Sequence, residues 1–185
     1  MSTTRNPTLL TVLLNFRTAE MTLRALEVAV REMEGIDGVI NVLDNASGDG
    51  SYEKIRDAVA ARSGEPGWQR VQVIRSAHNG GYGAGNNIAI RHGLPGGSAP
   101  DFVYLLNSDA FPEPGAVRAL LDHMVAHPEI GFTGSRIHGQ DGAYHQTAFR
   151  FPTIQSEFEG AACTGPISRL LRRYIVALPE PLQPQ

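Results

Sequence analysis

Residues 101–114 read DFVYLLNSDAFPEP, and this stretch decides the fold class. Residues 102–106 form a short, nearly uninterrupted apolar run, which is typical of a strand buried on both faces of a parallel sheet. The run ends in Asn107, Ser108 and Asp109. Open α/β sheets bind ligands at the carboxyl ends of their strands, so Asp109 is a candidate site residue. Its alternative role is to cap the next helix, because aspartate is a favoured N-cap residue.

Length and composition fit one globular domain. The chain has 185 residues, of which 42% are hydrophobic and 19% charged, enough for a sizeable core. A net charge of −3 provides no basic field for nucleic acid, so no nucleic-acid partner is expected. The single cysteine, Cys163, excludes an internal disulfide framework and suits a reducing compartment. Residues 9–16 are too short for a membrane helix, and no signal peptide is expected.

Apolar runs alternate with amphipathic stretches along the first 135 residues. Strands are predicted at residues 9–16, 38–43, 71–75, 102–106 and 130–135. Helical stripes follow the first, second and fourth of them, at Leu26-Ala29-Val30-Met33, Tyr52-Ile55-Val59 and Val117-Leu120-Leu121-Met124-Val125. This alternation predicts βαβ units and therefore an α/β fold with a mostly parallel sheet flanked by helices.

The last third of the chain is less regular. A hairpin is predicted over residues 136–150, turning at residues 140–142, and a short basic helix over residues 167–174. The predicted organisation is a domain at residues 1–150 and an irregular extension or linker at residues 151–185.

In a parallel sheet the carboxyl ends of all strands meet at one edge, which brings distant polar segments together. These segments are Phe16, Asp44 with its turn-rich neighbours, a glycine and asparagine run that begins at Asn79, and Asp109. The glycine run does not fit the dinucleotide spacing G-x-G-x-x-G, so that fold is set aside; close helix packing is its alternative role. An aromatic ring, carboxylates and backbone N–H donors suit a base, a ribose, a diphosphate and a bridging Mg²⁺ or Mn²⁺.

Four segments resemble the family 2 glycosyltransferases of the GT-A fold, which is Rossmann-like: LLNFRTAEMTLRAL, VLDNASGDGS, HNGGYGAGNN and YLLNSDAFPEPGAV. The resemblance covers about the first 150 residues and is strongest to rhamnosyltransferases and galactofuranosyltransferases. It implies a dTDP- or UDP-sugar donor, a glycan or lipid-linked acceptor, and a role in the synthesis of bacterial cell-wall or surface polysaccharide. A cytoplasmic location is implied, with peripheral association at the inner face of the membrane left open.

The resemblance also implies roles for individual residues. Asn107 and Asp109 match the ends of the family's D-x-D triplet; Asp109 would bind the metal, and Asn107 replaces the commoner aspartate. The remaining residues expected to contact the nucleotide-sugar are Asn15 and Phe16 beside the base, Asp44 and Asn45 hydrogen-bonded to it, and Asn79, Gly80, Gly81 and Asn86 in the glycine run.

An acidic pair that would deprotonate the acceptor hydroxyl for inverting transfer is not found after Asp109. Glu157 and Glu159 in SEFEG lack the expected surroundings, so the general base is unassigned. The expectation is a donor-binding half, truncated before the acceptor half, which would leave apolar surface exposed and favour self-association. Two alternatives stay open: a non-catalytic nucleotide-sugar-binding or interaction module, and a nucleotidyltransferase. The latter would need a glycine-rich phosphate loop after the first strand.

Overall fold

A computed structural model describes residues 6–139, 141–145, 147 and 151–162 of the chain. The chain forms two compact units, Met1–Thr133 and Gly134–Gln185, and each is described by itself. The sequence-based boundary at residue 150 stays a prediction.

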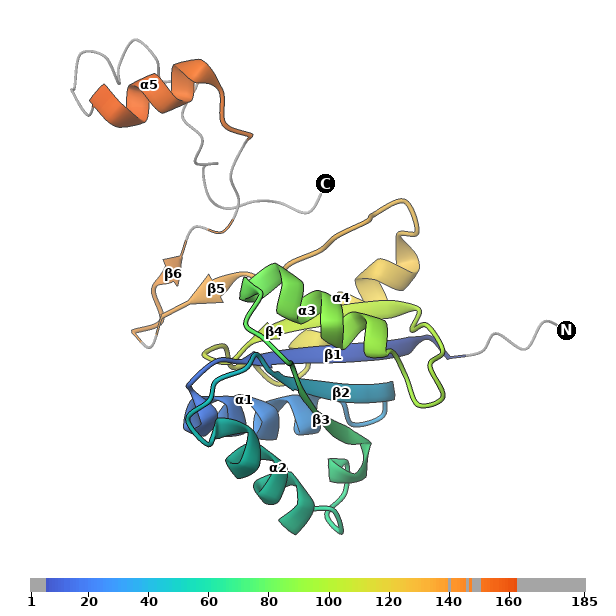
Figure 1. Cartoon of the computed structure of the whole chain (residues 1–185). Coiled ribbons are helices and arrows are strands. Elements are labelled where there is room, and N and C mark those ends of the chain that lie inside the picture. Colours follow the sequence, from blue (N-terminus) through green and yellow to red (C-terminus); the bar gives the residue numbers. More distant parts are fainter. Residues whose placement is uncertain (1–5, 140, 146, 148–150, 163–185) are drawn as a thin grey trace, which may run out of the picture. The chain divides into compact units, whose positions relative to one another are not determined.

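The first unit is a four-stranded parallel sheet with helices on both faces (Figure 1). Its strands are β1 (Thr8–Asn15), β2 (Asp37–Asp44), β3 (Val71–Arg75) and β4 (Phe102–Asn107). Its helices are α1 (Ala19–Glu32), α2 (Ser51–Ala61), the 3-10 turn η1 (Trp68–Arg70), α3 (Gly81–His92) and α4 (Ala116–Ala126). The strand order is β3-β2-β1-β4 and every pairing is parallel. The α/β fold predicted from the alternation is thus confirmed.

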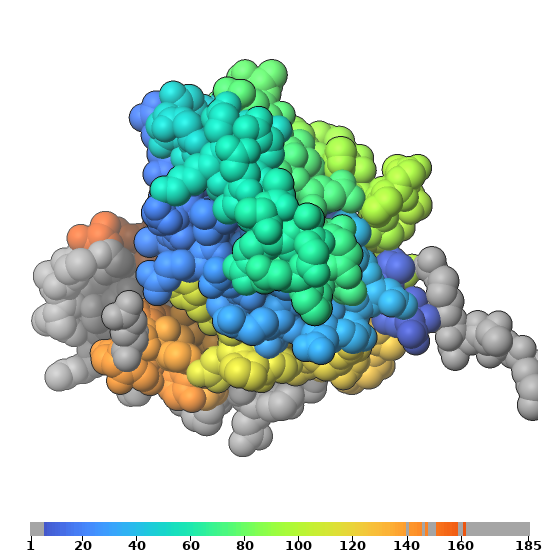
Figure 2. Space-filling model, turned by 90° about the horizontal axis from the view of Figure 1, so that it is seen from below, coloured from blue at the N-terminus to red at the C-terminus, as the bar shows by residue number. Residues whose placement is uncertain are grey.

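The core lies on both faces of β1 and β2. On one face Leu13 of β1 packs with Leu26 of α1, Ile55 of α2 and Leu121 of α4. On the other face Leu10 and its neighbours pack against α3. Figure 2 shows α1 and α2 side by side on the first of these faces. Both faces of the central strands are covered, which explains why their sequences are continuously apolar.

Helix α3 is fastened to the sheet at both of its ends. Asn41 is buried in β2, and its side-chain amide donates to the carbonyl oxygens of Ala89 and Gly93, both at 3.1 Å, at the carboxyl-terminal end of the helix. Nearer its start, a Cβ on Gly85 would lie 2.7 Å from Leu14 Cδ1. Gly85 therefore has the packing role considered as the alternative for the glycine run.

Strand β4 forms one edge of this sheet, and part of its side chains face solvent. Val103 and Leu105 are 41% and 45% exposed, and an apolar groove of about 410 Å³ runs between β4 and α4. The predicted fifth strand at residues 130–135 is wrong, since these residues are irregular and Phe132 is 96% exposed. Two glycines, Gly131 and Gly134, leave that segment with few side chains to pack and make ordering it costly.

The second unit contains β5 (Ile137–His138), β6 (Tyr144–His145) and α5 (Ile154–Ala162). Strands β5 and β6 are antiparallel, so the predicted hairpin is confirmed over the described residues. Helix α5 was not predicted from the sequence; its start is stabilised by Thr153, whose hydroxyl accepts from the Ser156 N–H at 3.2 Å. The predicted basic helix at residues 167–174 lies outside the described residues. Among those described, no helix has the length and apolar character needed to span a membrane.

Candidate functional site

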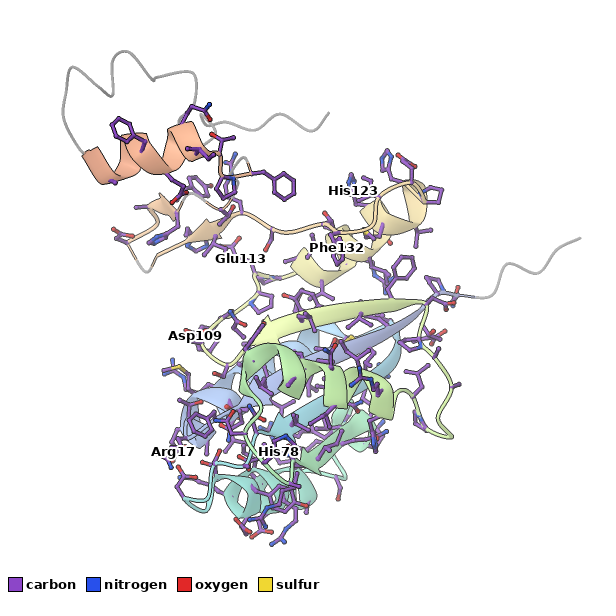
Figure 3. The ribbon with its side chains drawn as sticks, turned by 45° about the horizontal axis from the view of Figure 1, so that its top comes forward. Arg17, His78, Asp109, Glu113, His123 and Phe132 are labelled. Carbon is purple, nitrogen blue, oxygen red and sulfur yellow. The ribbon has the colours of Figure 1, made fainter. Side chains whose placement is uncertain are left out.

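The strand register brings the predicted polar segments to one edge of the sheet. Asn15 at the end of β1 pairs with Asp44 at the end of β2, and Leu14 pairs with Asn107 at the end of β4. The amino-terminal ends of α1 and α3 lie at this same edge. Figure 3 shows Arg17 and Asp109 there. The topology alone therefore assembles the segments that the sequence suggested.

Asp44 is buried and satisfied within the protein. Its side chain is 1% exposed. One carboxylate oxygen accepts hydrogen bonds from the Asn15 amide at 2.7 Å and from the Ser47 hydroxyl, and the other accepts from the Ser47 N–H at 3.1 Å. Three donors compensate for the removal of this carboxylate from water. The Asp44 side chain thus ties the end of β1 to the turn after β2.

Asn15 completes this network from the other side. It is fully buried, and its carbonyl oxygen accepts from the Thr22 hydroxyl at 2.8 Å. Asn15 and Asp44 both point into the protein, where they hold two strand ends and helix α1 together. Their expected contacts with a nucleobase stay a prediction.

Phe16 and Arg17 lie on the solvent side of the same strand end. Phe16 is 40% exposed, and the Arg17 guanidinium carbon lies 5.1 Å from the centre of its ring. Arg17 has φ = 58°, an unfavourable conformation for a side chain with a Cβ. Hydrogen bonds from its backbone N–H to the Ser47 hydroxyl (3.0 Å) and from its Nε to the Ser47 carbonyl oxygen (3.1 Å) hold it there.

Asn45 links the turn after β2 to the glycine run. Its amide nitrogen donates to the side-chain oxygen of Asn79 at 2.8 Å and to the backbone oxygen of Gly81 at 3.2 Å. The side-chain oxygen of Asn79 also accepts from the Gly81 N–H at 2.8 Å. The Asn45 carbonyl oxygen is buried and has no partner among the described residues. A buried acceptor without a donor is unusual and suggests a ligand or water contact.

The glycine run is mostly helical, which differs from the loop that its composition predicted. Gly80 is the N-cap and α3 begins at Gly81, which has φ = 83°. Asn86 is 5% exposed, and its amide donates to the Tyr82 carbonyl oxygen at 3.0 Å. These asparagine bonds offset the poor helix propensity of glycine, so the non-helical part of the run ends at Gly80.

The end of β4 is open. Tyr82 donates its hydroxyl hydrogen to the Asn107 side-chain oxygen at 2.8 Å. Asp109 is exposed, and no hydrogen bond or ion pair holds its carboxylate in the part of the chain that the structure describes. Helix α4 starts at Ala116 with Gly115 as its N-cap, so Asp109 is not the cap of that helix.

The donor set at this edge fits a divalent metal that arrives with its own ligands. The described residues contain no group of three or more histidine, cysteine, aspartate or glutamate side chains that could hold a metal ion. Mg²⁺ and similar ions are often bound by one or two carboxylates together with substrate phosphates and water. Asp109 alone can supply the protein carboxylate of such a site.

A charged groove next to this edge was not anticipated from the sequence. It has a volume of about 470 Å³ and opens between the starts of α1 and α2. Its charged lining residues are Arg17, Glu20, Arg24, Asp49 and Lys54. Hydrogen bonds from Ser51 lower the pKa of Asp49, with the positive charge of Arg17 adding to the effect. The seven-residue spacing of Arg17 and Arg24 was the available sequence signal, since it places them on one helix face.

Comparison with known proteins identifies the family. The model of glycosyl transferase family 2 matches residues 15–176, so the chain belongs to this family. Among curated protein sequences, none matches the chain.

Two solved structures with a similar fold are glycosyltransferases. The mannosyltransferase PcManGT from Pyrobaculum calidifontis, in complex with GDP-Man and Mn²⁺, has a TM-score of 0.52 and 17% identity; the match covers 65% of this chain and 33% of that chain. TarS 1-349 from S. aureus, in complex with UDP-GlcNAc, has a TM-score of 0.49 and 14% identity, and the match covers 65% and 32%. The match therefore spans about one third of the length of either structure. The likeness to PcManGT agrees with the GT-A fold expected from the sequence.

Proposed function

We propose that this chain is the donor-binding part of a glycosyltransferase that transfers a sugar, with inversion, from a nucleotide-diphospho-sugar to a glycan or lipid-linked acceptor. The observation that carries the proposal is Asp109, an exposed carboxylate at the carboxyl end of a central parallel strand. It lies on the same edge as an exposed aromatic ring, Phe16, and an unpaired buried acceptor, Asn45. The PcManGT structure contains GDP-Man and Mn²⁺, ligands of the class proposed here.

Phe16 and Asn45 support a pyrimidine nucleotide. Uracil and thymine each have one ring N–H donor, which matches the unpaired carbonyl oxygen of Asn45. The exposed ring of Phe16 offers a stacking surface for the base. Asp44 would act by fixing the neighbouring Asn45, because its own oxygens are occupied by Asn15 and Ser47. UDP and dTDP are the proposed nucleotides, in line with the sequence resemblance to rhamnosyltransferases and galactofuranosyltransferases.

Asp109 would hold a Mg²⁺ or Mn²⁺ ion, with Asn107 beside it. When bound, such an ion supplies a positive charge that stabilises the leaving diphosphate. Asn79, Gly80, Gly81 and Asn86 form or support the wall opposite Asp109, where the Tyr82–Asn107 hydrogen bond joins α3 to β4. The chain's own contribution is to bind and orient the donor at the edge of the sheet.

The general base is proposed to come from residues other than those assigned here. Inverting transfer requires a group that removes the proton of the acceptor hydroxyl, and Asp109 is committed to the metal. The match to the similar solved structures covers about one third of their length. A non-catalytic donor-binding module is the second candidate, favoured by the absence of an assigned base.

Calorimetric titration of UDP and dTDP, with and without Mn²⁺, tests the donor site. Binding of at least one nucleotide should strengthen with Mn²⁺, and this gain should disappear in Asp109→Ala but persist in Asp122→Ala, an exposed aspartate on α4. If neither nucleotide binds under either condition, the proposal is wrong. Sugar transfer by the wild-type chain would exclude the non-catalytic module.

A further inference from the structure

Tyr82 is a large exposed side chain in a segment that otherwise has almost none. It lies in the first turn of α3, its neighbours on both sides are glycines, and it is 54% exposed. Its hydroxyl nevertheless has a defined partner, the side-chain oxygen of Asn107, which lies 25 residues away at the end of β4. An exposed aromatic residue that is fixed at its polar tip requires an explanation beyond packing.

Tyr82 is held from two directions. Asn86 donates to its backbone carbonyl oxygen at 3.0 Å, and its own hydroxyl donates to Asn107 at 2.8 Å. Asn86 is buried, whereas Asn107 is exposed. The ring thus connects a rigid part of α3 to an open strand end, and it sets the separation between the two walls of the candidate donor site.

The hydrogen bond also determines what Asn107 presents to a ligand. Because its carbonyl oxygen accepts from Tyr82, the side-chain NH₂ group keeps two donors, and the described residues provide them with no partner. These donors lie two residues from the Asp109 carboxylate. Amide donors attract the oxygens of a diphosphate, whereas a second carboxylate in the same place would repel them.

We propose that Tyr82 is a positioning residue that orients the Asn107 amide, so that its NH₂ group donates to the diphosphate of the nucleotide. This inference rests on the proposed donor site and adds a second residue pair to it. Asn107 then contributes metal-independent affinity, and Asp109 contributes the metal-dependent part.

The test uses Tyr82→Phe, which removes one hydroxyl and keeps the ring. UDP and dTDP are titrated into the full chain in EDTA and in Mn²⁺, with Tyr52→Phe on α2 as the matched control. Tyr82→Phe should weaken binding by about threefold to tenfold in both conditions, as expected for the loss of one hydrogen bond. Tyr52→Phe should leave it unchanged.

Two further readouts separate positioning from a purely structural role. In an Asn107→Ala background, Tyr82→Phe should cause no further loss of affinity, because the two residues act as one unit. The NMR signals of the Asn107 NH₂ group should shift in Tyr82→Phe and not in Tyr52→Phe, even without nucleotide. Asn107→Asp should weaken binding more in EDTA than in Mn²⁺.

The outcomes distinguish this inference from the function on which it rests. Wild-type chain that binds neither nucleotide overturns both. Wild-type chain that binds, with Tyr82→Phe folded and equal to it in affinity, overturns only the role of Tyr82. An equal loss of affinity on Tyr82→Phe with and without Asn107 would also overturn it.

Discussion

Two strand ends at the same edge of the sheet differ in how their carboxylates are used. Asp44, after β2, is buried and accepts three hydrogen bonds from Asn15 and Ser47. Asp109, just after β4, is exposed and has no partner among the described residues. A buried, satisfied carboxylate stabilises the fold, whereas an exposed one can exchange water for a ligand. We conclude that the β1 and β2 ends form the scaffold of the site and that the β4 end carries its chemistry.

The largest expected effect separates these two carboxylates by stability. Asp44→Ala should lower the free energy of unfolding by about 3 kcal/mol, because it leaves the Asn15 amide and the Ser47 N–H buried without an acceptor. Asp109→Ala should change it by less than about 0.5 kcal/mol. Urea unfolding of both variants measures the difference, and equal losses would remove the distinction between scaffold and reactive end.

Two glycines of α3 test the same contrast on a smaller scale. A Cβ on Gly85 would lie 2.7 Å from Leu14 Cδ1 and 3.2 Å from Asn45 Cγ, whereas a Cβ on Gly83 would meet nothing within 4 Å. Gly85→Ala should therefore destabilise the protein by about 1–2 kcal/mol. Gly83→Ala should stabilise it by up to about 1 kcal/mol, since alanine is the better helix former.

Thermal unfolding of the two alanine variants provides the measurement. The asparagine network around Asn45 should be disturbed only in Gly85→Ala, which two-dimensional NMR would show as shifts of the Asn45 and Asn79 side-chain signals. Stabilisation by both substitutions would mean that α3 does not pack closely on the end of β2.

The smallest expected effect concerns pH and strand β4. Burial raises the pKa of the Tyr104 phenol, and the negative charge of Glu32 adds to the shift. A raised pKa in the folded protein favours the neutral phenol, so this contribution to stability is complete below the unfolded pKa of about 10. It is lost as pH rises through the folded pKa.

Unfolding at pH 8 and pH 11 should thus show a smaller alkaline loss of stability in Tyr104→Phe than in the wild type. Tyr144→Phe, at an exposed position in the second unit, serves as the control and should behave as the wild type does. An identical alkaline loss in all three proteins would show that Tyr104 is accessible to water, and that β4 is open along its length as well as at its end.

The sequence predicted the sheet and the place of the site because both follow from alternation along the chain. It placed Asp44 and Asp109 at strand ends, but it did not show that one carboxylate points inward and the other outward. That difference depends on Ser47 and Asn15, whose contacts form only when β1 and β2 pair. The Tyr82–Asn107 bond was missed for the same reason, since it joins residues 25 positions apart.

Local composition misled the prediction in two places. Glycine and asparagine disfavour helices, so residues 81–86 were expected to be a loop, yet Asn79 and Asn86 supply the hydrogen bonds that let α3 start at Gly81. The apolar residues around Phe132 suggested a fifth strand, yet the flanking glycines leave it irregular and Phe132 exposed.

The metal position is the central claim, and paramagnetic NMR with Mn²⁺ tests it most directly. A trace of Mn²⁺ added to the UDP-bound or dTDP-bound chain should broaden the amide signals of residues 107–111 first and those of residues 80–83 next. Asp109→Ala should abolish the effect. His123 and His127, whose rings are 4.6 Å apart near the other end of α4 (Figure 3), are the internal control and should keep sharp signals. Broadening centred on these histidines, or broadening at residues 107–111 that persists in Asp109→Ala, would contradict the account.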